Sequence, residues 1–293
     1  MARFLPVENP LFLDISRPSR NPDRAHYSRL WAASCPDGPF EGAILKVKVS
    51  ILIPAYNEEE TIAAVIQRVE SIALEGIKKE IIVIDDASSD RTGEVLKGIR
   101  NIQAIRHSNN AGKGAALTTG IRAATGDVVI FQDADLEYAP EDYPVVLQPL
   151  TEDRCDAVMG SRFLHERPVF WGTRKSPYLN HYIGNLLIIW ITNLLYGKRF
   201  TDYEGCYKAF RRSVLLDTPV ESTGFEFDNE LICKVMRKGV RIDEVPIQYH
   251  PRTYAEGKKI TWRHGLVMLW TIVKWRFLPL PASQAVVDRQ MAA

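Results

Sequence analysis

The sequence predicts an α/β protein whose core is a mixed, mainly parallel sheet covered by helices on both faces. Strand-like and helix-like segments alternate with short connections from residue 47 to about residue 131, which is the order of elements in a parallel sheet. Several apolar runs are short and uninterrupted, as strands buried on both faces are. The chain has 293 residues and 46% hydrophobic content, so it is long enough to bury one large core.

Residues 1–46 are predicted to form a loop-rich N-terminal extension. Closely spaced prolines prevent a long helix there, and we assign the extension no chemistry. The main domain is expected to span residues 47–260, and residues 261–293 are expected to form a helix and a C-terminal tail. The prolines of the extension are Pro6, Pro10, Pro18, Pro22, Pro36 and Pro39.

The first predicted strand is Val49–Pro54, an apolar run that proline stops. Three glutamates follow at positions 58–60. Acidic side chains complement the positive end of the helix macrodipole. We therefore expect these glutamates in the first turn of a helix that opens at Asn57 and runs to about Ala73.

The second predicted strand is Glu80–Ile84, and it ends in the acidic pair Asp85 and Asp86. Residues 88–90 (Ser-Ser-Asp) are typical helix caps, so they predict the start of the next helix. Residues 102–105 form a short third strand. Strand, helix, strand and helix in this order indicate parallel pairing.

A glycine-rich turn at residues 109–114 leads into a helix that ends near Ala124. It is not a Walker A loop, because Gly114 follows the lysine where Ser or Thr is required. It is not a G-x-G-x-x-G loop either, because Leu117 replaces the third glycine. We expect a tight turn that enters a helix, in preference to a phosphate-binding loop.

An Asp-x-Asp motif follows the buried strand Val128–Phe131, and the acids are Asp133, Asp135 and Glu137. Alternate residues of an extended chain share a face, so we expect the three carboxylates to point the same way. A hard divalent cation stabilises such like charges through oxygen ligands. A solvated acidic turn is the alternative. The position at the C-terminal end of a strand favours the ligand site, because open α/β sheets bind ligands there.

Three consecutive strand ends therefore carry polar groups: residues 54–58 (Pro-Ala-Tyr-Asn-Glu), residues 85–86, and residues 133–135. An aromatic ring stacks on a base, an aspartate accepts from base or ribose hydroxyls, and a metal ion bridges to a diphosphate. Each segment alone is explained by a helix cap or a surface turn. Their combination predicts a nucleotide-binding crevice.

The bulk composition excludes several classes of protein. The net charge is +1, so no global field favours nucleic acid. No C-x-x-C spacing indicates zinc, and the scattered cysteines are typical of a reduced, cytosolic protein. Charged residues near the N-terminus predict that no signal peptide is present. The cysteines are Cys35, Cys155, Cys206 and Cys233.

Two apolar segments predict membrane contact without a span. Residues 186–192 and 262–277 are both shorter than the ~20 apolar residues that cross a bilayer. The second has tryptophans and cations at its ends, which suits an interfacial helix near a lipid. For the first, a core helix remains an equal alternative. We expect peripheral binding at the cytoplasmic face of the membrane.

The three strand-end motifs read IPAYNE (53–58), VIDDASSD (83–90) and QDADLE (132–137). Together they resemble family 2 glycosyltransferases of the GT-A fold. More narrowly, they resemble the dolichyl- or polyprenyl-phosphate sugar synthases, such as dolichol-phosphate mannosyltransferase. The resemblance covers roughly residues 47–277. It continues through the segments 160–163 (GSRF), 205–211 (GCYKAFR), 245–249 (VPIQY) and 252–258 (RTYAEGK).

The resemblance implies the role of individual residues. Asp133 and Asp135 would bind Mg²⁺ or Mn²⁺ and, with Arg162, carry the catalysis. Glu137 stands where relatives often have glutamine as the third metal ligand, which keeps an oxygen ligand but adds a charge. Arg162, Arg252 and Lys258 would bind the acceptor phosphate. The implied contacts to the nucleotide-sugar donor are Pro54, Tyr56, Glu58, Ile84, Asp86 and Ala134.

This chemistry fits a metal-dependent, inverting transfer of a hexose from a UDP- or GDP-sugar to a polyprenyl or dolichyl phosphate. The metal ion stabilises the departing diphosphate. The acceptor phosphate has a second pKa near ~6, so it is already an anionic nucleophile at neutral pH. It needs no general base, and arginine and lysine suit its recognition.

Two other functions remain open at this point. A family 2 transferase with a hydroxyl acceptor (polysaccharide, protein or glycolipid) would need a general base, for which the candidates are Asp202, Glu204, Glu226 and Asp228. A non-catalytic protein that binds a nucleotide or a lipid phosphate is the second. The sequence does not identify the donor base, the sugar or the oligomeric state.

Overall fold

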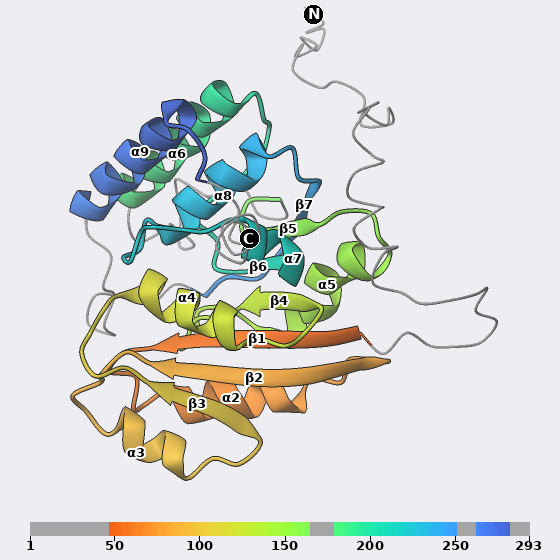
Figure 1. Ribbon diagram of the computed structural model, residues 1–293, viewed down its shortest axis with the longest axis vertical. Coiled ribbons are helices and arrows are strands. Elements are labelled where there is room, and N and C mark those ends of the chain that lie inside the picture. Colours follow the sequence, from red (N-terminus) through yellow and green to blue (C-terminus); the bar gives the residue numbers. More distant parts are fainter. Residues whose placement is uncertain (1–46, 165–178, 251–261, 282–293) are drawn as a thin grey trace, which may run out of the picture. The chain divides into compact units, whose positions relative to one another are not determined.

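The predicted mixed, mainly parallel sheet is present in the computed structural model, which describes residues 47–164, 179–250 and 262–281. Across these residues seven strands pair in the order β3-β2-β1-β4-β6-β5-β7 (Figure 1). Strand β6 runs antiparallel to both of its neighbours, and the other pairs are parallel. The strands are β1 (Val47–Ala55), β2 (Ile77–Asp85), β3 (Ile102–Arg106), β4 (Val128–Phe131), β5 (Ala157–Ser161), β6 (Lys208–Arg211) and β7 (Ile242–Pro246).

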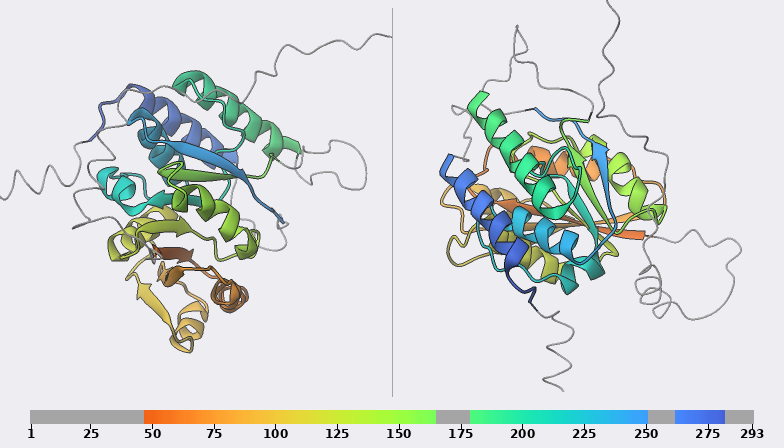
Figure 2. Two further views of the ribbon diagram at one scale, coloured as in Figure 1. Left: turned by 90° about the vertical axis from the view of Figure 1, so that its right-hand side faces the viewer. Right: turned by 90° about the horizontal axis from the view of Figure 1, so that it is seen from above.

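Helices cover both faces of this sheet, as predicted (Figures 1 and 2). The residues of α2, α3 and α5 belong to the core on one face, and those of α4 and α6 to α9 belong to the core on the other. The helices are α2 (Ile62–Ser71), α3 (Thr92–Lys97), α4 (Lys113–Ala123), the 3-10 helix η1 (Pro140–Asp142), α5 (Tyr143–Thr151), α6 (Leu179–Tyr196), α7 (Arg212–Asp217), α8 (Phe227–Arg237) and α9 (Trp262–Phe277).

The two cores exist because successive side chains of a strand point to opposite faces. In β1, Leu52 packs into the core beneath α4 and α8, whereas Ile51 and Ile53 pack into the core beneath α2 and α5. All three side chains are fully buried. A strand that is buried on both faces needs an unbroken apolar run, which is the pattern that the sequence shows here.

The start of α2 differs from the prediction. The helix begins at Ile62, and no acidic residue lies in its first turn. Asn57 adopts a left-handed conformation (φ 53°), and its Oδ1 accepts a hydrogen bond from the Ser89 N–H at 2.8 Å. This contact ties residues 57–60 to the loop after β2, so a turn replaces the predicted first helical turn.

Helices α6 and α9 lie side by side (Figures 1 and 2). The Tyr196 hydroxyl donates to the Ile272 carbonyl at 2.8 Å, and Arg276 Nε donates to the Leu195 carbonyl at 2.7 Å. Neither helix, nor any other helix among the described residues, has the length and apolar character needed to cross a bilayer.

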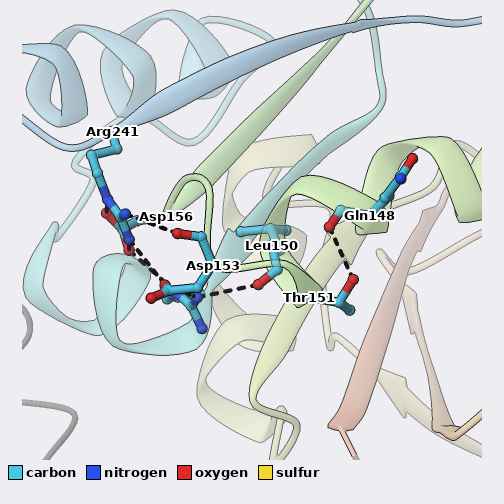
Figure 3. Close-up of polar contacts among 7 residues, drawn as sticks. Gln148, Leu150, Thr151, Asp153, Asp156 and Arg241 are labelled. Atoms are coloured by element: carbon cyan, nitrogen blue, oxygen red, sulfur yellow. Dashed lines mark hydrogen bonds and ion pairs between the residues drawn. The ribbon is translucent and has the colours of Figure 1, made fainter. Parts of the chain in front are cut away.

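An ionic cluster joins β5, β6 and β7 (Figure 3). It lies at the start of β5, the end of β6 and the start of β7, which are the strand ends opposite to the acidic ones. Asp156 Oδ1 accepts from Arg211 Nε at 3.2 Å, and its Oδ2 accepts from Arg241 Nε at 2.7 Å. Asp153 accepts from the same two arginines, but its side chain is 76% exposed. Asp156 is buried, so we infer that it is the member on which the cluster depends.

The variant Asp156→Asn is expected to lower the free energy of unfolding by about 1.5–3 kcal/mol, because hydrogen bonds between charged groups are lost in a buried place. Asp153→Asn is the matched control, and we expect it to cost at most about 1 kcal/mol because exposed ion pairs contribute little. Urea unfolding followed by circular dichroism measures both. Equal losses in the two variants would contradict this account of the cluster.

Candidate functional site

The candidate site lies where β1, β2 and β4 end. In the strand order β3-β2-β1-β4-β6-β5-β7 the chain continues from β1 toward β2 on one side and from β4 toward β5 on the other. The direction reverses between β1 and β4, and ligands bind at such a point in open α/β sheets. Each of these strand ends includes a residue with positive φ: Asn57 (53°), Ala87 (59°) and Leu136 (62°). Such conformations are costly for residues other than glycine and gather at functional sites.

The residues after β1 combine an accessible aromatic ring with a buried carboxylate. Tyr56 is 38% exposed. Glu58 is buried, and its Oε2 accepts a hydrogen bond from Thr61 Oγ1 at 2.9 Å. Pro54 is half-buried. The side chains of Ile84 and Ala134, also predicted to contact the donor, are buried.

The two aspartates at the end of β2 are buried and have strong partners. Asp85 forms an ion pair with Arg106. Asp86 Oδ1 lies 2.7 Å from His107 Nδ1 and accepts from the Ala111 N–H, and its Oδ2 accepts from the Gly112 N–H at 2.7 Å. Asp86 therefore anchors the glycine-rich turn, in addition to any donor contact.

The glycine-rich turn is a tight entry into α4, as predicted. Gly112 has φ 97°, and a Cβ on it would lie 2.4 Å from the Thr223 carbonyl oxygen. That carbonyl accepts from the N–H groups of Gly114 (2.7 Å) and Ala115 (3.2 Å). In phosphate-binding glycine-rich loops, such N–H groups bind the phosphate. Here they donate to a carbonyl of the protein itself.

Lys113 extends from this turn to the acidic end of β4. Its Nζ donates to Asp133 Oδ1 at 2.7 Å and lies 4.0 Å from Asp228 Oδ2. Burial by itself lowers the pKa of Lys113, but the Asp133 and Asp228 carboxylates outweigh it and hold that pKa well above its usual value. Burial has the opposite effect on Asp133 and raises its pKa, but the Lys113 ammonium outweighs burial, so the pKa of Asp133 is lowered. Both groups are therefore charged at neutral pH.

The acidic segment after β4 is a turn, so the expectation that an extended chain aligns its carboxylates was wrong. Residues 134 and 135 form a turn, and Leu136 is left-handed. Asp135 Oδ1 accepts from the Glu137 N–H at 3.1 Å. Within the residues that the structure describes, no three His, Cys, Asp or Glu side chains form a metal-binding group. Oxygen atoms from a ligand would have to complete a cation site here.

Arg162, which follows β5, is held in a buried bidentate pair. Its Nε lies 2.7 Å from Asp202 Oδ2, and its Nη2 lies 2.9 Å from Asp202 Oδ1. The guanidinium carbon lies 5.3 Å from the ring centre of Phe163 and 5.1 Å from that of Tyr249. Burial raises the pKa of Asp202, but Arg162 outweighs this effect and lowers it. Two donors of the guanidinium fork are thus used inside the protein.

A β-bridge between Tyr138 and Tyr249 joins the acidic segment to the segment after β7. The His250 N–H donates to the Glu137 carbonyl at 2.9 Å. His250 directly precedes the stretch that contains Arg252 and Lys258, and those two predicted phosphate ligands lie outside the described residues.

Comparison with known proteins identifies the family. The model of the family described as glycosyl transferase family 2 matches residues 50–218, which is more than half of the chain. The chain belongs to glycosyl transferase family 2. It is therefore a glycosyltransferase, and the interpretation as a non-catalytic binding protein is not supported.

Two curated relatives of this family 2 chain are named for dolichyl phosphate. It is 29% identical to a UDP-N-acetylglucosamine–dolichyl-phosphate N-acetylglucosaminyltransferase of Methanococcus voltae, over 72% of this chain and 90% of that one. It is 29% identical to the dolichol-phosphate mannosyltransferase of Pyrococcus furiosus, over 72% of this chain and 59% of that one. The resemblance to the polyprenyl-phosphate sugar synthase branch is confirmed.

Solved structures confirm the GT-A fold. Glucosyl-3-phosphoglycerate synthase from Mycobacterium tuberculosis, in complex with Mn²⁺, UDP and phosphoglyceric acid, matches with a TM-score of 0.62. The match covers 83% of this chain and 85% of the synthase at 20% identity. At that identity the likeness shows the fold alone.

Sequence reasoning located the strand ends but missed the cations that hold them. Lys113 was interpreted only as part of a turn, although its Nζ bonds Asp133. Lys208, which lies 3.6 Å from Asp228, was not singled out at all. For Lys113, the local signal is a lysine between two glycines at the start of a helix. Lys208 has no local signal, because its partner is 20 residues away and the contact depends on the fold.

Proposed function

We propose that this family 2 enzyme is a metal-dependent, inverting hexosyltransferase that transfers a hexose from a UDP- or GDP-sugar to a polyprenyl or dolichyl phosphate. The bridge between Tyr138 and Tyr249 carries the proposal. It joins the acidic segment, where a donor diphosphate would lie, to Tyr249, which in the sequence lies three residues before Arg252. In this proposal residues 47–260 form the transferase domain.

The proposed donor site lies over the ends of β1, β2 and β4. Tyr56 would stack on the base, since its ring is accessible. Glu58 and Asp86 would contact the nucleoside, and Asp86 also holds the turn that carries Lys113. The remaining proposed donor contacts are Pro54, Ile84 and Ala134.

The carboxylates of Asp133 and Asp135 fit Mg²⁺ or Mn²⁺, which prefer hard oxygen ligands and accept phosphate oxygens to complete their shell. We propose these two residues as the metal ligands, with phosphate oxygens completing the shell, because Glu137 does not gather with them into a three-carboxylate group among the described residues. When bound, the ion would stabilise the charge of the departing diphosphate as a Lewis acid. The Mn²⁺ and UDP named for the mycobacterial synthase support this choice.

The acceptor phosphate would be bound by Arg162, Arg252 and Lys258. Arg162 is fixed by Asp202 and lies against the Tyr249 ring, so its position is set before any ligand arrives. An anionic phosphate oxygen attacks the anomeric carbon in a single in-line displacement, and this route inverts the configuration. No general base is required.

We further propose that α6 and α9 dock on the cytoplasmic face of a membrane. Tryptophans at 190 and 270 are 63% and 66% exposed, and neither helix contains an acidic residue. Arg263, Lys274 and Arg276 would attract anionic headgroups through their positive charge. Lys274 also lies 3.5 Å from Glu221, and Arg276 also bonds the Leu195 carbonyl. The other large exposed apolar side chains here are Ile183, Leu186, Leu187 and Leu194 of α6, and Leu266, Val267 and Phe277 of α9.

The transfer reaction tests the proposal. Wild-type protein with Mn²⁺, a short polyprenyl phosphate in detergent and a panel of labelled UDP- and GDP-sugars is expected to form a lipid-linked monosaccharide. Asp135→Asn or added EDTA is expected to reduce the rate by at least about 100-fold, because preorganised charge stabilisation contributes this much. Arg252→Ala is expected to raise the KM for the lipid phosphate and to leave the KM for the donor unchanged.

A hydroxyl acceptor is the second candidate, and one observation favours it. Asp228 lies beside Lys113, and its buried Oδ1 accepts no hydrogen bond, with the Lys208 ammonium 3.6 Å away as its nearest cation. Donor consumption without lipid product, lost in Asp228→Asn, would support this candidate. It would contradict the phosphate acceptor.

Vesicle co-sedimentation tests the membrane face. The double variant Trp190→Ser/Trp270→Ser is expected to bind vesicles that contain phosphatidylglycerol at least about tenfold more weakly, which corresponds to ~1.4 kcal/mol. Val145→Ser is the matched control, because it removes an exposed apolar side chain from α5 on the opposite face of the sheet. Unchanged binding by the double variant would rule out this docking face.

A further inference from the structure

Lys113 is held in place by its backbone on both sides. Before it, the N–H groups of Ala111 and Gly112 donate to Asp86, and after it, the N–H groups of Gly114 and Ala115 donate to the Thr223 carbonyl. The glycines on either side have no room for a side chain. The backbone of the turn is therefore fixed, and any shift of the ammonium has to come from rotation within the Lys113 side chain.

The ammonium of Lys113 occupies one oxygen of a proposed metal ligand. It donates to Asp133 Oδ1 at 2.7 Å, and the two side chains are only 20% and 22% exposed. Asp228 lies 4.0 Å away on the other side. A cation that approaches Asp133 must displace this ammonium or accept its repulsion, and at partial burial that repulsion is weakly screened.

We propose that Lys113 is an internal counter-ion that competes with the divalent cation for Asp133, so that the metal binds tightly only together with the donor diphosphate. This inference rests on the proposed function, because it takes Asp133 as a metal ligand. Without a nucleotide, Lys113 neutralises Asp133 and disfavours the ion.

A diphosphate relieves this competition. It brings negative charge to the same strand end, and lysine binds phosphate as a point charge. The Lys113 ammonium exchanges its ion pair with Asp133 for one with the diphosphate. The carboxylate oxygen of Asp133 then becomes available to the metal. Metal and nucleotide then bind cooperatively, and by linkage each raises the affinity of the other by the same factor. As a result, Asp133 does not retain a divalent cation when no donor is bound.

The test measures Mn²⁺ binding without any turnover. Free Mn²⁺ is titrated by electron paramagnetic resonance against the full chain, alone and with saturating UDP or GDP. In Lys113→Met, Mn²⁺ binding without nucleotide is expected to be about tenfold tighter than in wild type, and the gain from adding nucleotide is expected to fall by a similar factor. Lys113→Arg keeps the charge and is expected to behave like wild type.

Lys97→Met is the matched control, because it removes the same charge from an exposed position on α3. Circular dichroism establishes that each variant is folded. If Lys113→Met binds Mn²⁺ without nucleotide no more tightly than wild type, Lys113 only contacts the donor and the inference is overturned. If wild type binds no Mn²⁺ with either nucleotide, the metal in the proposed function is wrong as well.

Discussion

Carboxylates that are withdrawn from water need partners, and this constraint shapes the whole end of the sheet. Asp85 pairs with Arg106, Asp133 with Lys113, and Asp202 with Arg162. Each cation comes from a different part of the chain than its acid. The strand ends, the glycine-rich turn and the segment after β5 are thus tied together by the same requirement. The acids hold the site in shape before any ligand arrives.

Asp86 is the acid with the widest structural effect. It accepts backbone N–H groups of the glycine-rich turn and contacts His107, so it determines where α4 begins. The start of α4 places Lys113 at the acidic segment. A residue that the family resemblance assigns to donor contact therefore also positions the cation that neutralises Asp133. In the proposed function, this one residue serves both the structure and the binding of the donor.

The buried strands were predictable because a strand covered on both faces needs an uninterrupted apolar run, as in Val128–Phe131. The family was predictable because short motifs follow those strands. The start of α2 was not, because the turn there depends on the contact between Asn57 and Ser89, which the fold alone brings together. Likewise, nothing local in the sequence shows that Lys113 reaches Asp133.

Tertiary context also changed the account of the aromatic and cationic residues. Trp275 was expected at a membrane interface, but it is buried, with the Lys234 ammonium 3.7 Å from its ring centre. Trp270 on the same helix is exposed instead. Arg162 is proposed to bind the acceptor phosphate, and the sequence did not show that Asp202 holds it in place. In both cases the residue type was informative, and the partner depended on packing.

The central claim is that a metal ion and a nucleotide diphosphate meet at the end of β4. Anomalous diffraction from crystals grown with Mn²⁺ and UDP or GDP locates the ion directly. The account predicts a manganese peak at the carboxylates of Asp133 and Asp135, with the diphosphate against it and the base at Tyr56. A nucleotide bound at another edge of the sheet, or a manganese peak away from both aspartates, would contradict it.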